Sequence, residues 1–182
     1  MNLPTFLTWL RIAAIPLLVL LFYLPVPWAW PAAAMLFALA ALTDALDGYL
    51  ARRLNQQSRF GAFLDPVADK LIVAAALILL VHEHGDIAMT VAAVVIVGRE
   101  IVISALREWM AEVGARAAVA VSSLGKIKTI AQMIALICLL YHQPLWGLPV
   151  FEIGYWLLLL AAALTVLSAF FYLRAASVAL KT

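Results

Sequence analysis

Long apolar runs separated by short polar segments extend along the whole chain. A transmembrane helix needs roughly 17–25 mostly apolar residues, and six runs reach that length. They cover about residues 6–24, 29–53, 61–81, 87–112, 123–142 and 150–175. Because the runs are long and lack the apolar–polar alternation of membrane strands, they do not indicate a β-barrel. The pattern predicts an all-α integral membrane protein, with six transmembrane helices in a single domain over residues 1–182.

The composition supports this interpretation. Hydrophobic residues make up 67% of the chain and the mean hydropathy is +1.08, whereas soluble domains are about 45–50% apolar. The one cysteine, Cys138, lies inside an apolar run and cannot form an intrachain disulfide. We interpret it as a small core residue.

The basic residues lie toward one side of the predicted bundle. The connections near residues 25–28, 82–86 and 142–149 contain no Lys or Arg. Because cytoplasmic loops carry the excess of Lys and Arg, the opposite side is predicted to be cytoplasmic. Six spans would place both termini on that side.

Four aspartates interrupt the apolar pattern near the predicted cytoplasmic surface: Asp44, Asp47, Asp65 and Asp69. The members of each pair are three or four residues apart, so each pair shares one helix face. The polar turn at 55–58 is short, so the two helices are antiparallel neighbours and the pairs can converge. A charged side chain at the bilayer centre costs roughly 2.5–3.5 kcal/mol. Binding of Mg²⁺, Mn²⁺ or Ca²⁺ explains all four carboxylates together and indicates phosphate chemistry.

The four aspartates are also compatible with two roles that need no phosphate chemistry. They could form Asp–Arg pairs that hold two helices together, although buried ion pairs contribute little net stability after desolvation. They could instead line a cation pathway, although transporter sites usually lie near the bilayer midplane and these acids gather at one face.

The spacing of the acidic residues resembles the signature of the CDP-alcohol phosphotransferase family, and every fixed position matches: Asp44-x₂-Asp47-Gly48-x₂-Ala51-Arg52-x₈-Gly61-x₃-Asp65-x₃-Asp69. The resemblance implies a six-helix fold that binds a CDP-linked alcohol or lipid on the cytoplasmic side. It implies that Asp44, Asp47 and Asp65 hold one or two divalent metals, Mg²⁺ or Mn²⁺. Asp69 is implied to be a ligand, the general base, or both.

The same region supplies candidate contacts to the cytidine diphosphate group. Small residues beside the aspartates leave space for a ligand, and Arg52 or Ser58 can bond to it. The candidate CDP-binding residues are Asp44, Gly48, Ala51, Arg52, Ser58 and Gly61. Asn2, Thr8 and Arg11 are further possible donor-side contacts. Alternatively, these three residues form an interfacial helix start, with Thr8 solvated and Arg11 reaching toward the surface.

The acceptor alcohol is predicted from a separate set of residues. The segments at 2–11, 98–108, 112–116 and 119–133 resemble the phosphatidylglycerophosphate synthase branch of the family, whose acceptor is sn-glycerol 3-phosphate. Arg99 and Arg107 are eight residues apart and share a helix face. An acceptor phosphate would need such cations, and the candidates are Arg107, Lys126, Arg99, Arg116 and Lys128. Alternatively, they are cytoplasmic flanking charges or partners of Glu100 and Glu108.

These observations lead to one hypothesis. The chain is expected to be a metal-dependent phosphatidyltransferase of the bacterial cytoplasmic (inner) membrane, with its active site facing the cytoplasm. CDP-diacylglycerol and sn-glycerol 3-phosphate would give phosphatidylglycerophosphate and CMP, with Asp69 as the base. No Ser or Cys is suitably placed as a nucleophile, so no covalent intermediate is expected. The resemblance implies a homodimer. The alternatives are a different acceptor alcohol or a cation-coupled transporter.

Overall fold

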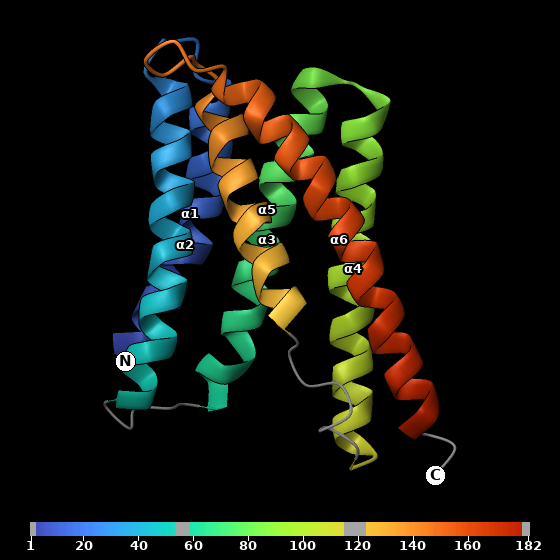
Figure 1. Ribbon diagram of the computed structural model, residues 1–182. Coiled ribbons are helices and arrows are strands. Elements are labelled where there is room, and N and C mark those ends of the chain that lie inside the picture. Colours follow the sequence, from blue (N-terminus) through green and yellow to red (C-terminus); the bar gives the residue numbers. More distant parts are fainter. Residues whose placement is uncertain (1–2, 54–58, 115–122, 180–182) are drawn as a thin grey trace.

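The chain folds into a bundle of long helices. The structure is a computed structural model that describes residues 3–53, 59–114 and 123–179 (Figure 1). Within these ranges there are six α-helices: α1 (Leu3–Tyr23), α2 (Ala29–Arg53), α3 (Arg59–His84), α4 (Ile87–Glu112), α5 (Ser123–Tyr141) and α6 (Val150–Ala179). The predicted all-helical class is confirmed, and each predicted run corresponds to one helix.

The helix boundaries follow from local chemistry. Asp86 ends the connection between α3 and α4 and caps α4, because its carboxylate accepts hydrogen bonds from the backbone N–H groups of Ala88 and Met89. An aspartate at this position satisfies N–H groups that have no partner inside the helix. Gly85, just before it, has a φ of +58°, a conformation that glycine adopts without steric cost.

Three of the helices are individually long and apolar enough to cross a membrane. In the described residues these candidate spans are Phe6–Tyr23, Ile87–Glu112 and Val150–Ser177. Two shorter apolar helical segments are Ala29–Asp44 and Ile127–Tyr141. Large apolar side chains such as Ile78, Val94 and Phe170 are exposed on the outer surface. A protein surface of this kind fits a lipid environment rather than water.

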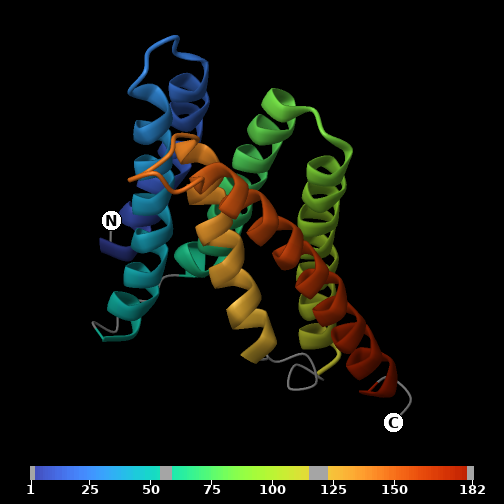
Figure 2. The same ribbon diagram turned by 45° about the horizontal axis from the view of Figure 1, so that its top comes forward.

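The packing of the helices places α6 across the bundle. α5 packs most extensively against α6, α1 packs against α2 and α3, and α4 packs against α6. Figure 2 shows α6 running obliquely from the top of α5 to the lower end of α4. The main core contains Leu18, Phe37, Leu77 and Leu136, and a smaller core joins α4 to α6.

The crossing of α5 and α6 depends on a glycine. A Cβ atom at Gly154 would lie 2.7 Å from the Cys138 Cβ atom and 3.0 Å from the Ala135 carbonyl oxygen. Both distances are shorter than ordinary van der Waals contact. The missing side chain therefore permits the close approach of the two helices.

The ends of the bundle differ in what they contain. The α1–α2, α3–α4 and α5–α6 connections lie at one end, and α1 begins and α6 ends toward the other (Figure 1). The latter end also holds the second half of α2 and the first half of α3, which carry the aspartates. The helix segments that carry the aspartates therefore lie at the opposite end of the bundle from the three connections that lack Lys and Arg.

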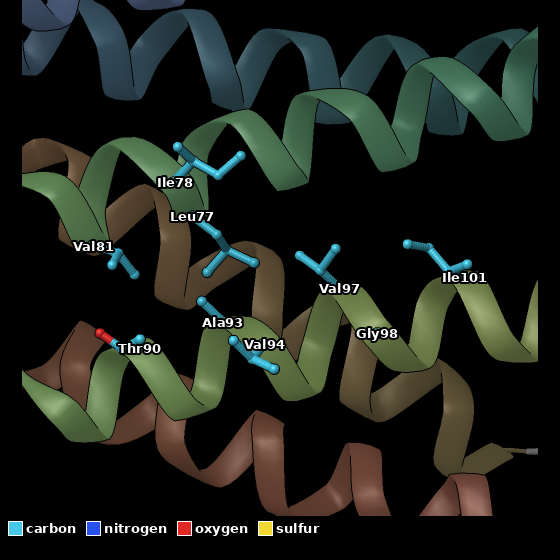
Figure 3. A pocket seen from close by; sticks show the side chains of 9 residues that line it. All are labelled: Leu77, Ile78, Val81, Thr90, Ala93, Val94, Val97, Gly98 and Ile101. Atoms are coloured by element: carbon cyan, nitrogen blue, oxygen red, sulfur yellow. The ribbon is translucent and has the colours of Figure 1, made fainter.

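An apolar groove of about 440 Å³, open to the outer surface, lies between α3 and α4. Figure 3 shows its lining, which includes Leu77 and Ile78 from α3 and Val94, Val97 and Ile101 from α4. Its lining residues carry no charged side chain. It therefore has no group for metal or phosphate chemistry, and the candidate active site lies elsewhere.

Candidate active site

A buried arginine on α1 joins the aspartates of α2 and α3. The Arg11 side chain is 0% exposed, and its Nη1 atom lies 2.5 Å from Asp69 Oδ1 and 3.2 Å from Asp44 Oδ1. One guanidinium group therefore bridges carboxylates from two helices. The two aspartates, which are 25 positions apart in the sequence, are held together as predicted.

Thr8, on the same face of α1, holds the next aspartate. Its hydroxyl donates a hydrogen bond to Asp65 Oδ1. Thr8 and Arg11 are three residues apart, so they point to the same side of the helix, and both are buried. The alternative in which Thr8 is solvated and Arg11 reaches the membrane surface is wrong. The two side chains face the acidic residues, where their contacts orient the carboxylates.

The carboxylates are more accessible than the guanidinium group behind them. The Asp44 and Asp69 side chains are 41% and 32% exposed, compared with 0% for Arg11. Asp44 and Asp69 place two carboxylates against one guanidinium group, and Thr8 holds the carboxylate of Asp65. The excess negative charge and the accessible oxygen atoms suit a hard divalent cation.

The donor chemistry fits a metal, although the described residues do not complete a binding site. In the described ranges, no three His, Cys, Asp or Glu side chains form a group that could hold an ion. Asp47 follows Asp44 by one helical turn, but its side chain lies outside the described residues. Asp44, Asp65 and Asp69 are the described candidates for metal ligands.

Several other predicted site residues also lie outside the described part of the chain. Asn2, Ser58 and Arg116 are not described, and the side chains of Ala51, Arg52 and Lys126 are not described within their helices. The same holds for the surroundings of Gly48. Gly61 is described and is buried near the start of α3.

A second group of charged residues lies between α4, α5 and α6. We call Arg99, Arg107 and Lys128 the basic cluster. Lys128 Nζ lies 2.5 Å from Glu100 Oε1, and Arg99 Nη1 lies 3.1 Å from the same oxygen. The Lys128 side chain is only 1% exposed. The alternative that pairs basic residues with Glu100 is therefore confirmed for Arg99 and Lys128. Arg107 contacts Tyr172 instead.

Two residues of α6 that the sequence analysis did not identify hold the arginines of this cluster. Arg99 Nη2 donates a hydrogen bond to Ser168 Oγ over 3.2 Å, and Arg107 Nη2 donates to the Tyr172 hydroxyl over 2.9 Å. The signal for them was a polar stripe on an apolar helix, because Thr165, Ser168 and Tyr172 recur at spacings of three and four.

Part of the hydrogen-bonding capacity of the basic cluster is not used. Among the described residues, the Nε atoms of Arg99 and Arg107 are buried and have no hydrogen-bond partner. A buried donor without a partner is costly and unusual in folded proteins. Each Nε–H group therefore keeps an unused donor that is enclosed by neighbouring protein atoms.

The model of one protein family, CDP-alcohol phosphatidyltransferase, matches residues 1–167. The chain belongs to the CDP-alcohol phosphatidyltransferase family. The match includes both aspartate pairs and the basic cluster, so these residues lie in the part of the chain that carries the family likeness.

Individual members of the CDP-alcohol phosphatidyltransferase family match nearly the whole chain. A protein of Pseudomonas fluorescens is 56% identical over 183 residues, covering 100% of this chain and 93% of its own length. Proteins of Escherichia coli strain K12 and Shigella flexneri serotype 5b are 53% identical over 175 residues, covering 96% of this chain and 94% of theirs. All three are named CDP-diacylglycerol–glycerol-3-phosphate 3-phosphatidyltransferase.

Proposed function

We propose that the protein transfers the phosphatidyl group of CDP-diacylglycerol to sn-glycerol 3-phosphate, which gives phosphatidylglycerophosphate and CMP. Family membership and the names of relatives that match nearly the full chain support this reaction. The structural observation that supports the choice of acceptor is the basic cluster, in which Arg99 and Lys128 share one carboxylate, that of Glu100, and Arg107 has no carboxylate partner among the described residues. An acceptor that carries a phosphate group matches that excess of positive charge.

The donor is assigned to the aspartates near α1. Asp44, Asp47, Asp65 and Asp69 would hold Mg²⁺ or Mn²⁺, which when bound would neutralise pyrophosphate charge and favour departure of CMP. Arg11 and Thr8 fix the orientation of Asp44, Asp69 and Asp65 through the contacts described above. The proposed contacts to cytidine diphosphate come from Gly48, Ala51, Arg52, Ser58 and Gly61.

The acceptor is assigned to the basic residues of α4 and α5. Arg99, Arg107 and Lys128 belong to the described basic cluster, and Lys126 and Arg116 are proposed to complete the phosphate site. The guanidinium groups of Arg99 and Arg107 can donate to phosphate oxygens.

The proposed chemistry is a direct displacement. Asp69 accepts the proton of the acceptor's primary hydroxyl group, and the hydroxyl oxygen forms a bond to the phosphorus atom next to diacylglycerol. The bond from that phosphorus to the bridging oxygen of CMP breaks, and CMP leaves with the bonding electrons. Asp69 is suited to this role because its carboxylate is oriented by Arg11 yet remains 32% exposed.

The membrane arrangement is part of the proposal. We place the protein in the bacterial cytoplasmic membrane with six spans, both termini and the active site facing the cytoplasm, and a homodimer as the assembled form. The distribution of Lys and Arg supports this orientation. The residues proposed to bind the cytidine diphosphate group and glycerol 3-phosphate would then face the cytoplasm. The diacylglycerol chains of the donor would stay in the bilayer.

The product of the reaction tests this proposal. Purified protein in detergent is incubated with CDP-diacylglycerol, glycerol 3-phosphate and Mg²⁺, and the lipid product is identified by mass spectrometry. We expect a lipid that carries both the phosphodiester and the terminal phosphate of the acceptor. Formation of a product only with a different alcohol would support the alternative acceptor, and no CMP with any alcohol would favour a transporter.

A further inference from the structure

Tyr172 lies between the two arginines of the basic cluster. Its side chain belongs to a small buried core with Ile103 and Met110, and the residue is 5% exposed. The guanidinium carbon of Arg99 is 5.5 Å from the centre of the Tyr172 ring, and that of Arg107 is 5.1 Å from it. The Tyr172 hydroxyl also accepts the hydrogen bond from Arg107.

This contact brings together two charges that the helix backbone keeps apart. Arg99 and Arg107 are eight residues apart on α4, so their Cα atoms are separated by roughly 12 Å along the helix axis. Two guanidinium groups repel each other, whereas the face of an aromatic ring attracts each of them. The Tyr172 ring lies within 5.5 Å of both guanidinium carbons. It therefore favours conformations of Arg99 and Arg107 in which the two guanidinium groups lie beside the same ring.

The arrangement of the arginines matters for an anionic ligand. Long arginine side chains lose about 2 kcal/mol of conformational freedom when they are fixed. Binding is tighter when the binding groups are held in place before the ligand arrives. The ring and the hydroxyl group hold the two arginines while leaving both Nε–H groups without a hydrogen-bond partner in the described residues.

We propose that Tyr172 is a positioning residue for the acceptor, which holds Arg99 and Arg107 so that their guanidinium groups bind the terminal phosphate of a phosphorylated polyol. This inference rests on the proposed function and extends it to α6. Tyr172 itself does not contact the substrate in this account. Its effect is exerted through the two arginines.

Two substitutions separate the contributions of the ring and the hydroxyl group. Tyr172→Phe keeps both ring faces and loses the hydrogen bond to Arg107, so the KM for glycerol 3-phosphate should rise about two- to tenfold. Tyr172→Leu removes the ring as well, and the KM should rise about ten- to a hundredfold. The KM for CDP-diacylglycerol and kcat at saturating acceptor should stay within about twofold of wild type, because the donor site is not altered.

The matched control is on the same helix. The Tyr155 hydroxyl donates a hydrogen bond to Asp86 over 3.1 Å, at the end of α6 farther from the basic cluster. Tyr155→Phe and Tyr155→Leu should leave the KM for glycerol 3-phosphate unchanged. An equal rise in these variants would mean that α6 packing, rather than positioning of the arginines, controls the affinity.

A double variant tests whether Tyr172 acts through Arg107. Arg107→Ala alone should raise the KM for the acceptor about ten- to a hundredfold. Tyr172→Phe should add less than about twofold in the Arg107→Ala background, because the hydrogen bond it removes is already absent. If Tyr172→Phe raises the acceptor KM by the same factor in wild type and in the Arg107→Ala variant, Tyr172 does not act through Arg107.

The outcomes distinguish this inference from the proposed function. If wild-type protein releases no CMP with glycerol 3-phosphate, the proposed function fails and the inference fails with it. If wild type is active and both Tyr172 variants have the wild-type acceptor KM, only the inference fails. Parallel loss of donor affinity in both variants would show a general structural role and would also overturn it. Tyr172→Phe, which preserves the volume of the ring, keeps the test valid if Tyr172→Leu does not fold.

Discussion

Arg11 and Lys128 are long cationic side chains that are almost completely buried, and each contacts acidic residues. Arg11 contacts Asp44 and Asp69, and Lys128 contacts Glu100. Buried ion pairs often contribute little to stability compared with apolar packing, yet removing one partner is strongly destabilising. Their retention in a membrane protein agrees with a role in orienting carboxylates and cations at a binding site.

Substitution of a single aspartate tests the proposal that these carboxylates bind a divalent metal. Asp65→Asn removes the charge of a proposed ligand and keeps its shape, so turnover should fall by about two orders of magnitude or more. The Mg²⁺ concentration for half-maximal CMP release should rise in any residual activity. Titration of EDTA-treated protein with Mg²⁺ or Mn²⁺ measures both effects.

An aspartate far from the site provides the control for this substitution. Asp86→Asn keeps an effective helix cap on α4 and should leave turnover and metal dependence unchanged. Full turnover of EDTA-treated wild-type protein in metal-free buffer would contradict the metal assignment.

Residue spacing predicted that the aspartates converge and named Thr8 and Arg11 as candidates, but it did not predict which carboxylates these two side chains contact. The predicted convergence is seen for Asp44 and Asp69, which share Arg11. The two helices that carry them make few contacts with each other in the described residues, and both pack against α1 instead. The bonds from Thr8 and Arg11 depend on how α1 packs against α2 and α3. Sequence spacing within α1 shows only that the two side chains share a face. Tyr172 was missed for the same reason, since its partners are on another helix.

At the scale of the helices, hydrophobic runs predicted the boundaries closely. The second and fourth predicted runs coincide with α2 (Ala29–Arg53) and α4 (Ile87–Glu112). The third run continues three residues farther, to His84, because polar residues after an apolar segment can remain helical until Gly85 changes the backbone direction. The packing of α5 against α6 could not be predicted from the hydrophobic runs, because all six runs are similarly apolar.

The close contact between α5 and α6 gives a prediction for stability. Gly154→Ala would place a methyl group 2.7 Å from the Cys138 Cβ atom and 3.0 Å from two backbone atoms of α5. The helices must separate to relieve this overlap, so the free energy of unfolding should decrease by about 1–3 kcal/mol. Thermal or denaturant unfolding in detergent measures the change.

Gly98→Ala is the matched control for this helix contact. A Cβ atom at Gly98, in the middle of α4, would have no heavy atom within 4 Å. The substitution should be neutral or stabilise the protein by about 0.4–1 kcal/mol, because alanine favours the helix. Equal destabilisation by both substitutions would mean that the α5–α6 contact is not specially close.

At the scale of the whole molecule, the fold separates two kinds of charge. The aspartates of α2 and α3 are joined through α1, and the basic cluster joins α4, α5 and α6. This division matches a reaction with two substrates, one bound through a pyrophosphate group and the other through a terminal phosphate. A cation transporter would have no evident need for the basic cluster.

This separation of charges also explains the contribution of the last quarter of the chain. Residues 136–182 are mostly apolar in the sequence, and no acceptor contact was predicted there. In the structure α6 crosses the bundle and supplies Ser168 and Tyr172 to the arginines of α4. An apolar pattern predicts that a helix is buried in the bundle or the membrane, but it does not predict which polar side chains of other helices it will contact.

Recognition of the second substrate by its phosphate group is tested most directly by CMP release with matched acceptors. Purified protein is assayed with CDP-diacylglycerol and Mg²⁺ together with glycerol 3-phosphate, glycerol, serine or inositol. Loss of a charge-assisted contact to phosphate costs about 1.5–3 kcal/mol per contact, so kcat/KM should be at least about a hundredfold higher for glycerol 3-phosphate than for glycerol. Equal kcat/KM for the two alcohols, or a preference for serine or inositol, would show that the protein does not select its acceptor by the phosphate group.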